Sequence, residues 1–208
     1  MSTLLPLFPL QLVVFPRTHL PLHIFEERYK EMVGEAIRSE SEFGIVLAKG
    51  DGIVNAGCTV TVERVVTEYP DGRMDVITQG ARRFEILYLD QEKAYLRGEV
   101  QYFDDDENET VPDLLQQRAI QMYREVAQCT DLHNYVEPVL SDPQLSFQLA
   151  HAAQDADFQS VLLRSRSEIE RLEQLADYLE RQMPQFREIA RLKHVAPMNG
   201  FGRKPAGL

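Results

Sequence analysis

The chain has 208 residues, of which 44% are hydrophobic and 26% charged, a composition typical of a globular protein rather than a disordered one. Its net charge is −11, which argues against nucleic acids and anionic membranes as partners, because both are usually bound by a basic surface. The acidic excess is uneven: residues 1–110 carry 11 Lys and Arg against 20 Asp and Glu, whereas residues 111–208 carry 11 against 13.

The sequence favours a cytoplasmic protein. Its two cysteines, Cys58 and Cys129, form no closely spaced pair and predict no disulfide framework. The apolar N-terminus lacks the positive residues and the cleavage site of a signal peptide. No apolar run of about 18 residues is free of prolines and charges, so no transmembrane helix is expected.

Prolines divide the apolar opening of the chain into short pieces. Proline cannot donate the N–H that a strand interior needs, so it is found at strand ends, edges and bulges. Residues 5–14 are therefore predicted as short strand pieces, residues 15–21 as a turn, and residues 20–25 as a second strand. Residues 26–37 place apolar side chains on one helical face and predict a helix. The prolines concerned are Pro6, Pro9, Pro16 and Pro21.

Further strands are predicted up to residue 103. An apolar strand at 43–48 precedes an alternating strand at 58–69, whose change of phase at 64–66 indicates a bulge. The Pro-Asp-Gly sequence at 70–72 is typical of a turn. Six or seven short strands in this half predict a small barrel or curled sheet. The strands after the turn are expected at 73–80, 82–89 and 94–103.

The second half of the chain is predicted to be helical. An acidic segment at 104–113 marks the boundary, and a solvated linker is favoured over a Ca²⁺ loop because no glycine and no alternating ligand positions are present. Helical spacing of apolar residues then follows up to the C-terminal tail. We expect a β-rich subdomain at 1–108, a helical subdomain at 109–195 and a flexible tail at 196–208.

Capping and proline chemistry predict two details of the helical half. Ser141 or Asp142 is suited to cap a helix that has a proline in its first turn. Residues 169–190 carry apolar side chains at spacings of three and four, a pattern typical of the core face of a bundle helix that also allows self-association. Pro184 would cost a helix interior about 3 kcal/mol, so a kink or break is expected near residues 180–184.

Motifs of common catalytic and metal sites are absent from the sequence. It has no phosphate-binding G-x-x-x-x-G-K-[ST] loop, no H-E-x-x-H and no G-x-S-x-G. His19 and His23 flank a proline in a predicted strand, where such positions lie about 13 Å apart, too far for one metal ion. No cofactor and no metal are therefore expected. A hydrolase that pairs Cys58 or Cys129 with a histidine is an alternative, since such pairs meet only in the folded chain.

Several segments resemble the N-terminal domain family of Lon proteases. The opening segments are LPLFPL (5–10), VVFP (13–16), LPLHIFE (20–26) and RYKEMV (28–33). The later ones are GCTVTVERV (57–65), G-x-R-R-F (80–84) and LLRSRSEIERLEQLADYLE (162–180). The resemblance implies an α+β fold, in which a curled six-stranded sheet similar to PUA-like barrels is followed by a helical bundle. In the full proteases the ATPase and Ser–Lys peptidase modules follow this domain, and the 208 residues contain neither, so we expect a stand-alone member that is not an enzyme.

Two functions are weighed for this chain. The first is a non-enzymatic module or adaptor that binds unfolded or hydrophobic polypeptide segments, which predicts an exposed apolar patch of several hundred Å². The alternative is small-molecule or nucleic-acid binding, as in PUA-like barrels, which predicts a local basic groove with aromatic residues. The candidate binding residues are Phe15, Phe25, Tyr29, Arg82 and Phe84.

Overall fold

The structure is a computed structural model that describes residues 4–106, 110–130 and 137–195. The tail predicted at 196–208 lies outside the described residues. Within the described part of the chain, no helix is long and apolar enough to cross a membrane.

The chain divides into two compact units. Unit 1 comprises Met1–Glu109 and Gln154–Glu168, and unit 2 comprises Thr110–Ala153 and Ile169–Leu208. The chain therefore enters unit 2, returns to unit 1 for one short segment, and ends in unit 2. Each unit is described by itself below.

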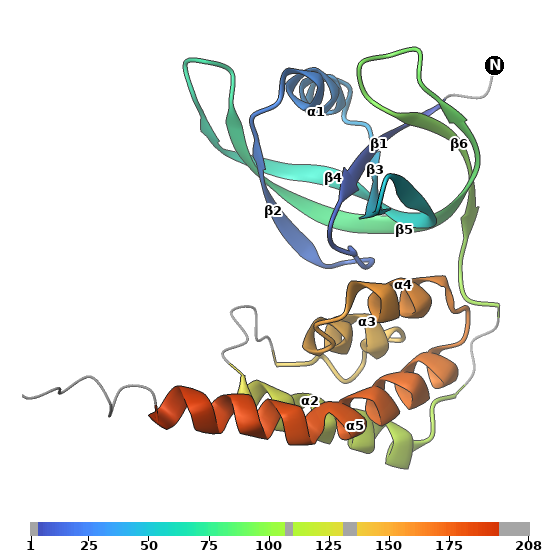
Figure 1. Cartoon of the computed structure of the whole chain (residues 1–208). Coiled ribbons are helices and arrows are strands. Elements are labelled where there is room, and N and C mark those ends of the chain that lie inside the picture. The colour runs from blue at the N-terminus through green and yellow to red at the C-terminus, as the bar shows by residue number, and fades with distance from the viewer. Residues whose placement is uncertain (1–3, 107–109, 131–136, 196–208) are drawn as a thin grey trace, which may run out of the picture. The chain divides into compact units, whose positions relative to one another are not determined.

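A six-stranded sheet forms the centre of unit 1 and curls into a ring (Figure 1). Its strands are β1 (Leu5–Leu10), β2 (His19–Ile24), β3 (Phe43–Lys49), β4 (Gly52–Glu68), β5 (Met74–Asp90) and β6 (Arg97–Phe103). The strand order is β2-β5-β4-β3-β1-β6, and β6 also pairs with β5, which closes the ring. β1 and β3 are parallel, and the other pairs are antiparallel. The curled six-stranded sheet expected from the sequence is confirmed.

β2 is an edge strand. β5 is long enough to take two partners along one side: its residues 74–79 pair with β2, and its residues 83–90 pair with β6. In the described part of the chain, β2 has no other partner strand. Pro21 lies within β2, a position that an edge strand tolerates because the missing N–H can face away from the sheet.

The irregular features predicted around β4 are present. The register between β4 and β5 shifts twice between residues 62 and 67, in agreement with the expected bulge. At the turn, Gly72 has a φ of +80°, which glycine adopts without the steric cost that a side chain would bring. Gly72 N also donates a hydrogen bond to Tyr69 O at 2.9 Å, which closes the hairpin.

Two helices pack within unit 1. They are α1 (Glu27–Ser39) and α4 (Ala156–Arg164). α1 buries an apolar face that includes Met32 and Val33. α4 contacts β4 and begins at a side-chain cap, because Asp155 Oδ1 accepts a hydrogen bond from Phe158 N at 3.1 Å.

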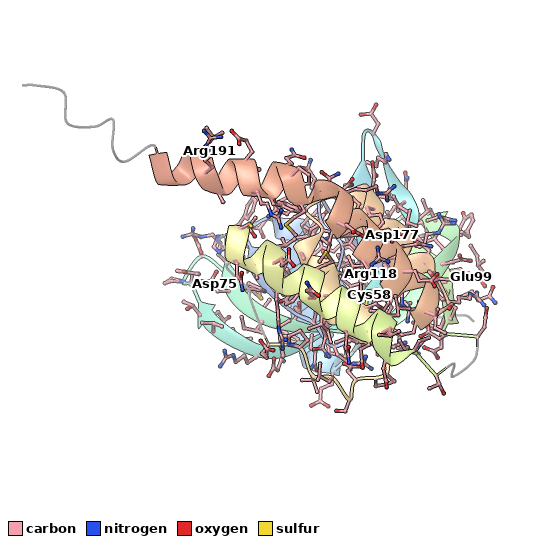
Figure 2. The ribbon with its side chains drawn as sticks, turned by 90° about the horizontal axis from the view of Figure 1, so that it is seen from below. Cys58, Asp75, Glu99, Arg118, Asp177 and Arg191 are labelled. Atoms are coloured by element: carbon pink, nitrogen blue, oxygen red, sulfur yellow. The ribbon has the colours of Figure 1, made fainter. Side chains whose placement is uncertain are left out.

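Unit 2 is helical. Its elements are α2 (Asp113–Cys129), α3 (Leu145–Leu149), the 3₁₀ turn η1 (Ala150–Ala152) and α5 (Glu168–Val195), of which only the first residue is assigned to unit 1. Arg118 joins α2 to α5 on the surface, where its Nη2 donates to Asp177 Oδ1 at 2.7 Å (Figure 2). In the interior, Arg171 Nε donates to Ser146 Oγ at 2.9 Å. The α+β fold class is therefore confirmed.

The helix expected after Ser141 or Asp142 begins later than predicted. α3 starts at Leu145. Asp142 Oδ1 accepts a hydrogen bond from Gln144 N at 2.9 Å, so it closes a local turn ahead of the helix instead of capping it.

The sequence predicts a kink or break near residues 180–184. α5 runs through Pro184 without interruption, so the break is wrong, and the kink stays a prediction. Proline removes one helical hydrogen bond and crowds the preceding turn. On both sides of it, Leu179, Met183 and Phe186 are buried, and tertiary packing of this kind supplies most of the stability of a helix in a protein. Packing therefore outweighs the local cost.

Candidate binding groove in unit 1

An apolar groove lies in unit 1 where the end of β1, β2 and the first turn of α1 meet. Its volume is about 430 Å³. Apolar side chains make up most of its lining, among them Phe8, Pro9, Leu10, Leu22, Phe25 and Tyr29. Glu26 and Arg28 also line it, and their side chains pair with each other at 2.8 Å. The groove is therefore apolar with its charges internally balanced.

Phe25 is the exposed aromatic residue of the groove. It directly follows β2, and 60% of the residue is exposed. Within β2, the buried Leu22 and Ile24 alternate with exposed residues, so the same alternation turns Phe25 outward. Its ring stacks with that of His23, with 5.9 Å between the centroids. An exposed phenyl ring beside an apolar groove can be reached by a partner without unfolding of the domain.

Tyr29 lines the groove from α1, but the residue is buried. Its ring stacks on Phe8 of β1 with 4.0 Å between the centroids, and the Arg28 guanidinium lies 4.6 Å from its centroid. Burial raises the pKa of the Tyr29 hydroxyl above its ordinary value, so the side chain is uncharged at neutral pH. Tyr29 therefore anchors α1 to β1 and completes an apolar wall.

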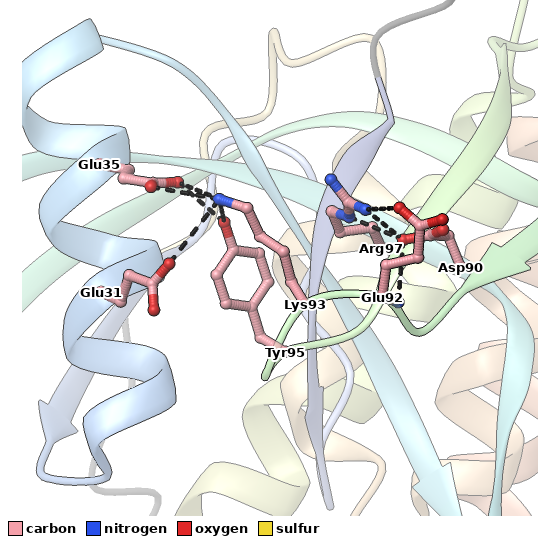
Figure 3. A network of polar contacts seen from close by, with 7 residues as sticks. All are labelled: Glu31, Glu35, Asp90, Glu92, Lys93, Tyr95 and Arg97. Atoms are coloured by element: carbon pink, nitrogen blue, oxygen red, sulfur yellow. Dashed lines mark hydrogen bonds and ion pairs between the residues drawn. The ribbon is translucent and has the colours of Figure 1, made fainter.

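A polar network holds α1 against the segment between β5 and β6 (Figure 3). The Tyr95 hydroxyl donates to Glu35 Oε2 at 2.8 Å, and Lys93 Nζ donates to the same oxygen at 3.1 Å. These hydrogen bonds, Tyr95 first, lower the pKa of Glu35, so the carboxylate is ionised at neutral pH. Nearby, Arg97 pairs with Asp90 at 2.6 Å. The network fixes the helix that carries one wall of the groove.

The outer face of β2 carries histidines that face carboxylates. His23 Nδ1 lies 2.6 Å from Asp75 Oδ1, and the Tyr69 hydroxyl donates to Asp75 Oδ2 at 2.8 Å. The hydrogen bond with His23, followed by that from Tyr69, lowers the pKa of Asp75. His19 pairs with Glu63 at 3.2 Å. The residues that the structure describes contain no group of three or more His, Cys, Asp or Glu able to hold a metal ion.

Phe15 and Phe84, expected as exposed contacts, are core residues of the folded chain. Both are 0% exposed. The Phe84 ring is packed on two glycines, because a Cβ on Gly44 would lie 2.6 Å from it and a Cβ on Gly57 would lie 2.7 Å from it. A partner cannot touch these rings while the chain is folded, which corrects the expectation of a patch containing them.

The two neighbouring arginines of β5 point in opposite directions, as strand alternation predicts. Arg82 is on the surface, where its Nη2 donates to Glu42 Oε2 at 2.9 Å and its guanidinium lies 3.8 Å from the Tyr102 centroid. Arg83 is 1% exposed and pairs with Asp105 at 2.6 Å. Asp105 therefore does not act as a solvated linker residue, and Arg82 is already engaged by an acid and a ring.

Arg83 also secures the C-terminal end of α4. Its Nη1 donates to Leu163 O at 3.1 Å and to Ser165 O at 2.6 Å. These carbonyls lie at the end of the helix, where backbone acceptors lack helical partners. The buried guanidinium thus ties residues 163–165 and Asp105 to β5, which is a structural task.

The cysteines do not form an obvious nucleophilic site. Cys58 is buried in β4, and burial raises its pKa to about 12. A thiol with so high a pKa is protonated at neutral pH and is a poor nucleophile. Cys129 is half-buried at the end of α2. The hydrolase alternative therefore gains no support from Cys58.

Sequence reasoning missed the β1 side of the groove. Phe8, Pro9 and Leu10 were assigned only to a strand, although they line the groove. Residues 5 and 6 of β1 pair with β6, whereas residues 7–10 pair with β3. The only available signal was Pro9, because a proline in a strand suggests an edge without a second partner.

The ring-shaped sheet followed along the chain by helices defines a class of α+β domain seen in solved structures. A Lon N-terminal domain protein from Xanthomonas campestris matches with a TM-score of 0.69 and 25% identity, over 85% of this chain and 98% of that one. The N-terminal domain of a Mycobacterium avium complex Lon protease has the same fold, with a TM-score of 0.62 and 18% identity, over 86% of this chain and 98% of that one.

The chain belongs to the family of the ATP-dependent protease La (LON) substrate-binding domain, whose profile matches residues 4–188. Among curated relatives, Lon protease of Parabacteroides distasonis is 32% identical over an alignment of 110 positions that covers 49% of this chain and 13% of that protein. Lon protease of Anaeromyxobacter dehalogenans is 29% identical over 109 residues, again 13% of its length. The match is thus confined to a small part of these relatives.

Proposed function

We propose that this chain binds unfolded or hydrophobic polypeptide segments without catalysing a reaction on them, and that the groove beside Phe25 is the binding site. The observation that carries the proposal is an apolar groove of about 430 Å³ next to a phenylalanine that is 60% exposed. Membership of a substrate-binding domain family supports the same class of ligand.

The groove suits a polypeptide side chain in size and chemistry. Ligand sites are concave and mostly apolar, with a few polar groups that fix orientation. Here the apolar walls come from β1, β2 and α1, and the Glu26–Arg28 pair supplies polar groups to the lining. Unfolded proteins expose apolar side chains that folded proteins bury. A groove of this kind therefore discriminates unfolded from folded chains.

The nucleic-acid alternative has weaker support. It requires a local basic groove, and the arginine of this groove, Arg28, is neutralised by Glu26. A second depression of about 700 Å³ beside α1 contains Lys30 and Arg38, but Glu31 and Asp71 line it as well. Mixed charge of this kind does not favour a polyphosphate backbone.

Binding of a permanently unfolded protein tests the proposal. Fluorescently labelled, reduced and carboxymethylated α-lactalbumin is titrated with the chain, and anisotropy reports the complex. The native form of the same protein is the ligand control. We expect the unfolded form to bind and the native form to bind at least about tenfold more weakly, since apolar burial drives the interaction. Equal binding of both forms would contradict the proposal.

Two matched variants locate the site. Phe25→Asp places a charge on the exposed ring position and is expected to abolish most of the binding. Leu87→Asp makes the same change at another exposed residue of unit 1, where 62% of the leucine is exposed, and is expected to leave binding unchanged. Loss of binding in both variants, or in neither, would remove the groove from the proposal.

A further inference from the structure

We infer that unit 1 binds its polypeptide as an added β-strand along the free edge of β2, with a preference for apolar segments flanked by Lys and Arg. The inference rests on the proposed function and specifies its geometry and its ligand class. Neither the backbone pairing nor the charge preference follows from the presence of an apolar groove alone.

The first observation is the unpaired edge of β2. β2 pairs with β5 alone among the strands of the described residues. In an antiparallel pair, alternate residues direct their N–H and C=O groups to the neighbouring strand, and the residues between them direct these groups outward. An exposed edge of this kind is a template for an additional strand.

The position of proline shows which residues face outward. Gly80 N donates to Thr18 O at 2.8 Å, so the Thr18 carbonyl faces β5. Leu20 and Leu22 lie two and four residues further along, opposite Thr78 and Val76, so their backbone groups face β5 as well. Pro21, which has no N–H, falls between them and belongs to the outward set. His23 belongs to that set as well, and its N–H is available to an added strand.

Pro21 also limits where a strand can be added. At Pro21 the edge offers a carbonyl but no donor, as is common where proteins protect a strand edge from uncontrolled pairing. From His23 onward both groups are present. His23 and Ile24, at this end of β2, line the groove together with Phe25. A strand added here would place its side chains alternately over the groove and away from it.

The second observation is the charge of unit 1. Its residues carry 13 Lys and Arg against 23 Asp and Glu, a net charge of −10, so nearly all of the chain's −11 belongs to this unit. Beside the groove, Glu27 begins α1 with 89% of its side chain exposed but pairs with Lys30 at 2.8 Å, so the negative charge comes from the unit as a whole and not from this residue. Because the Glu26–Arg28 pair leaves the groove itself balanced, the surrounding field is negative and attracts cationic segments.

These two observations select one occupant. An extended segment supplies backbone groups for the edge and apolar side chains for the groove, and flanking lysines or arginines lie in the negative field. An acidic segment would satisfy the edge and the groove but would be repelled. A polyanion would be repelled and would lack apolar side chains. The occupant is therefore an unfolded, basic and apolar polypeptide.

A peptide series tests both parts with the full chain. Three fluorescent peptides share one apolar core: one has lysines at both ends, one has glutamates there, and one has lysines and N-methyl groups at alternate core residues. Anisotropy at low salt is expected to show at least about tenfold tighter binding of the lysine peptide than of the glutamate peptide. Added salt should shrink this ratio, because it screens exposed charges.

The backbone part has two independent readouts. The N-methylated peptide keeps its charges but loses edge donors, and is expected to bind about fivefold more weakly or worse. In the protein, His23→Pro removes the outward N–H, whereas the matched His23→Ala removes the imidazole and keeps the N–H. We expect the proline variant to weaken binding of the lysine peptide more than the alanine variant does, because both lose the imidazole and only the proline variant loses the N–H. If the proline variant fails to fold by circular dichroism, the N-methylated peptide decides the matter.

The outcomes separate this inference from the proposed function. Equal affinity for lysine and glutamate peptides would overturn the charge preference. Unchanged binding of the N-methylated peptide would overturn strand addition. In both cases the proposed function would stand if Phe25→Asp still abolished binding. No binding of any of the three peptides would overturn the proposed function itself.

Discussion

The carbonyl oxygen of Phe15 lies so close to Gly80 that a Cβ at this glycine would be 2.0 Å from it. Gly80 also exchanges backbone hydrogen bonds with the same loop, because its N–H donates to Thr18 O at 2.8 Å and its carbonyl accepts from Arg17 N at 2.7 Å. The loop between β1 and β2 is therefore seated directly on the backbone of β5. This contact sets the position of β2 and of the groove beside it.

Gly80→Ala is expected to destabilise unit 1 by about 3 kcal/mol, because backbone must move to accommodate the new methyl group. Urea unfolding followed by far-ultraviolet circular dichroism measures the loss. Gly52→Ala is the matched control, since its nearest neighbour would be Lys49 O at 3.9 Å, an ordinary contact. A Gly80 variant as stable as the Gly52 variant would show that the loop is not seated as described.

Phe84→Ala is expected to lower the stability of the chain, whereas Phe25→Ala is expected to weaken binding with little change in stability. Removing the fully buried Phe84 ring leaves a cavity above Gly44 and Gly57 and should cost about 3–5 kcal/mol. Removing the exposed Phe25 ring should change the free energy of unfolding by less than about 0.5 kcal/mol and should weaken polypeptide binding. Unfolding curves and the anisotropy titration together check the pair. Equal destabilisation by both variants would contradict the division between core and surface.

The neighbouring arginines of β5 make a second matched pair. Arg83→Met should cost about 3–5 kcal/mol, because Asp105 and the carbonyls of Leu163 and Ser165 lose a buried partner. Arg82→Met removes an exposed pair with Glu42 and should cost less than about 1 kcal/mol. Hydrogen exchange adds a local readout, since amides at the end of α4 should exchange faster only in the Arg83 variant. Unchanged exchange there would mean that Arg83 does not hold this segment.

The β-rich half was largely predictable because local chemistry marks its boundaries. Proline marks the edge strand, and the Pro-Asp-Gly sequence marks the hairpin turn. The exposed position of Phe25 was also within reach of the sequence. Leu22 and Ile24 point inward from β2, so Phe25, the residue after Ile24, must point outward. Alternation within one strand decides this case without any tertiary information.

The burial of Phe84 was not predictable in this way. Arg83 and Phe84 are adjacent on β5 and both are buried, so alternation between buried and exposed positions could not single out Phe84 as the core residue. The ring is buried because β3 and β4 present glycines to it across the closed sheet. The groove itself depends on the meeting of β1, β2 and α1, which the pattern of no single element predicts.

Pro184 illustrates a local rule that tertiary packing overrides. Pro184→Ala restores a helical N–H and removes crowding of the preceding turn, and Pro184 is exposed, so no packing is lost. We expect α5 and unit 2 to gain about 1–3 kcal/mol in the free energy of unfolding. The matched control is Gln185→Ala, an exposed neighbour where only helix propensity changes. A gain no larger than that of the control would show that the helix bears no cost at the proline.

The chemistry of Cys58 tests the enzymatic alternative. With a pKa of about 12, only about one thiol in ten thousand is ionised at pH 8, and the thiolate is the reactive form. In a Cys129→Ser variant, iodoacetamide at pH 8 should leave Cys58 unlabelled in the folded chain and label it in urea, as mass spectrometry would show.

The Cys58 thiol should also lower the free energy of unfolding at alkaline pH. The unfolded chain releases the thiol proton near pH 8.5, whereas the folded chain retains it to higher pH, so stability is present at neutral pH and falls as pH rises toward 12. Rapid labelling of the folded variant at pH 8 would instead restore Cys58 as a candidate nucleophile.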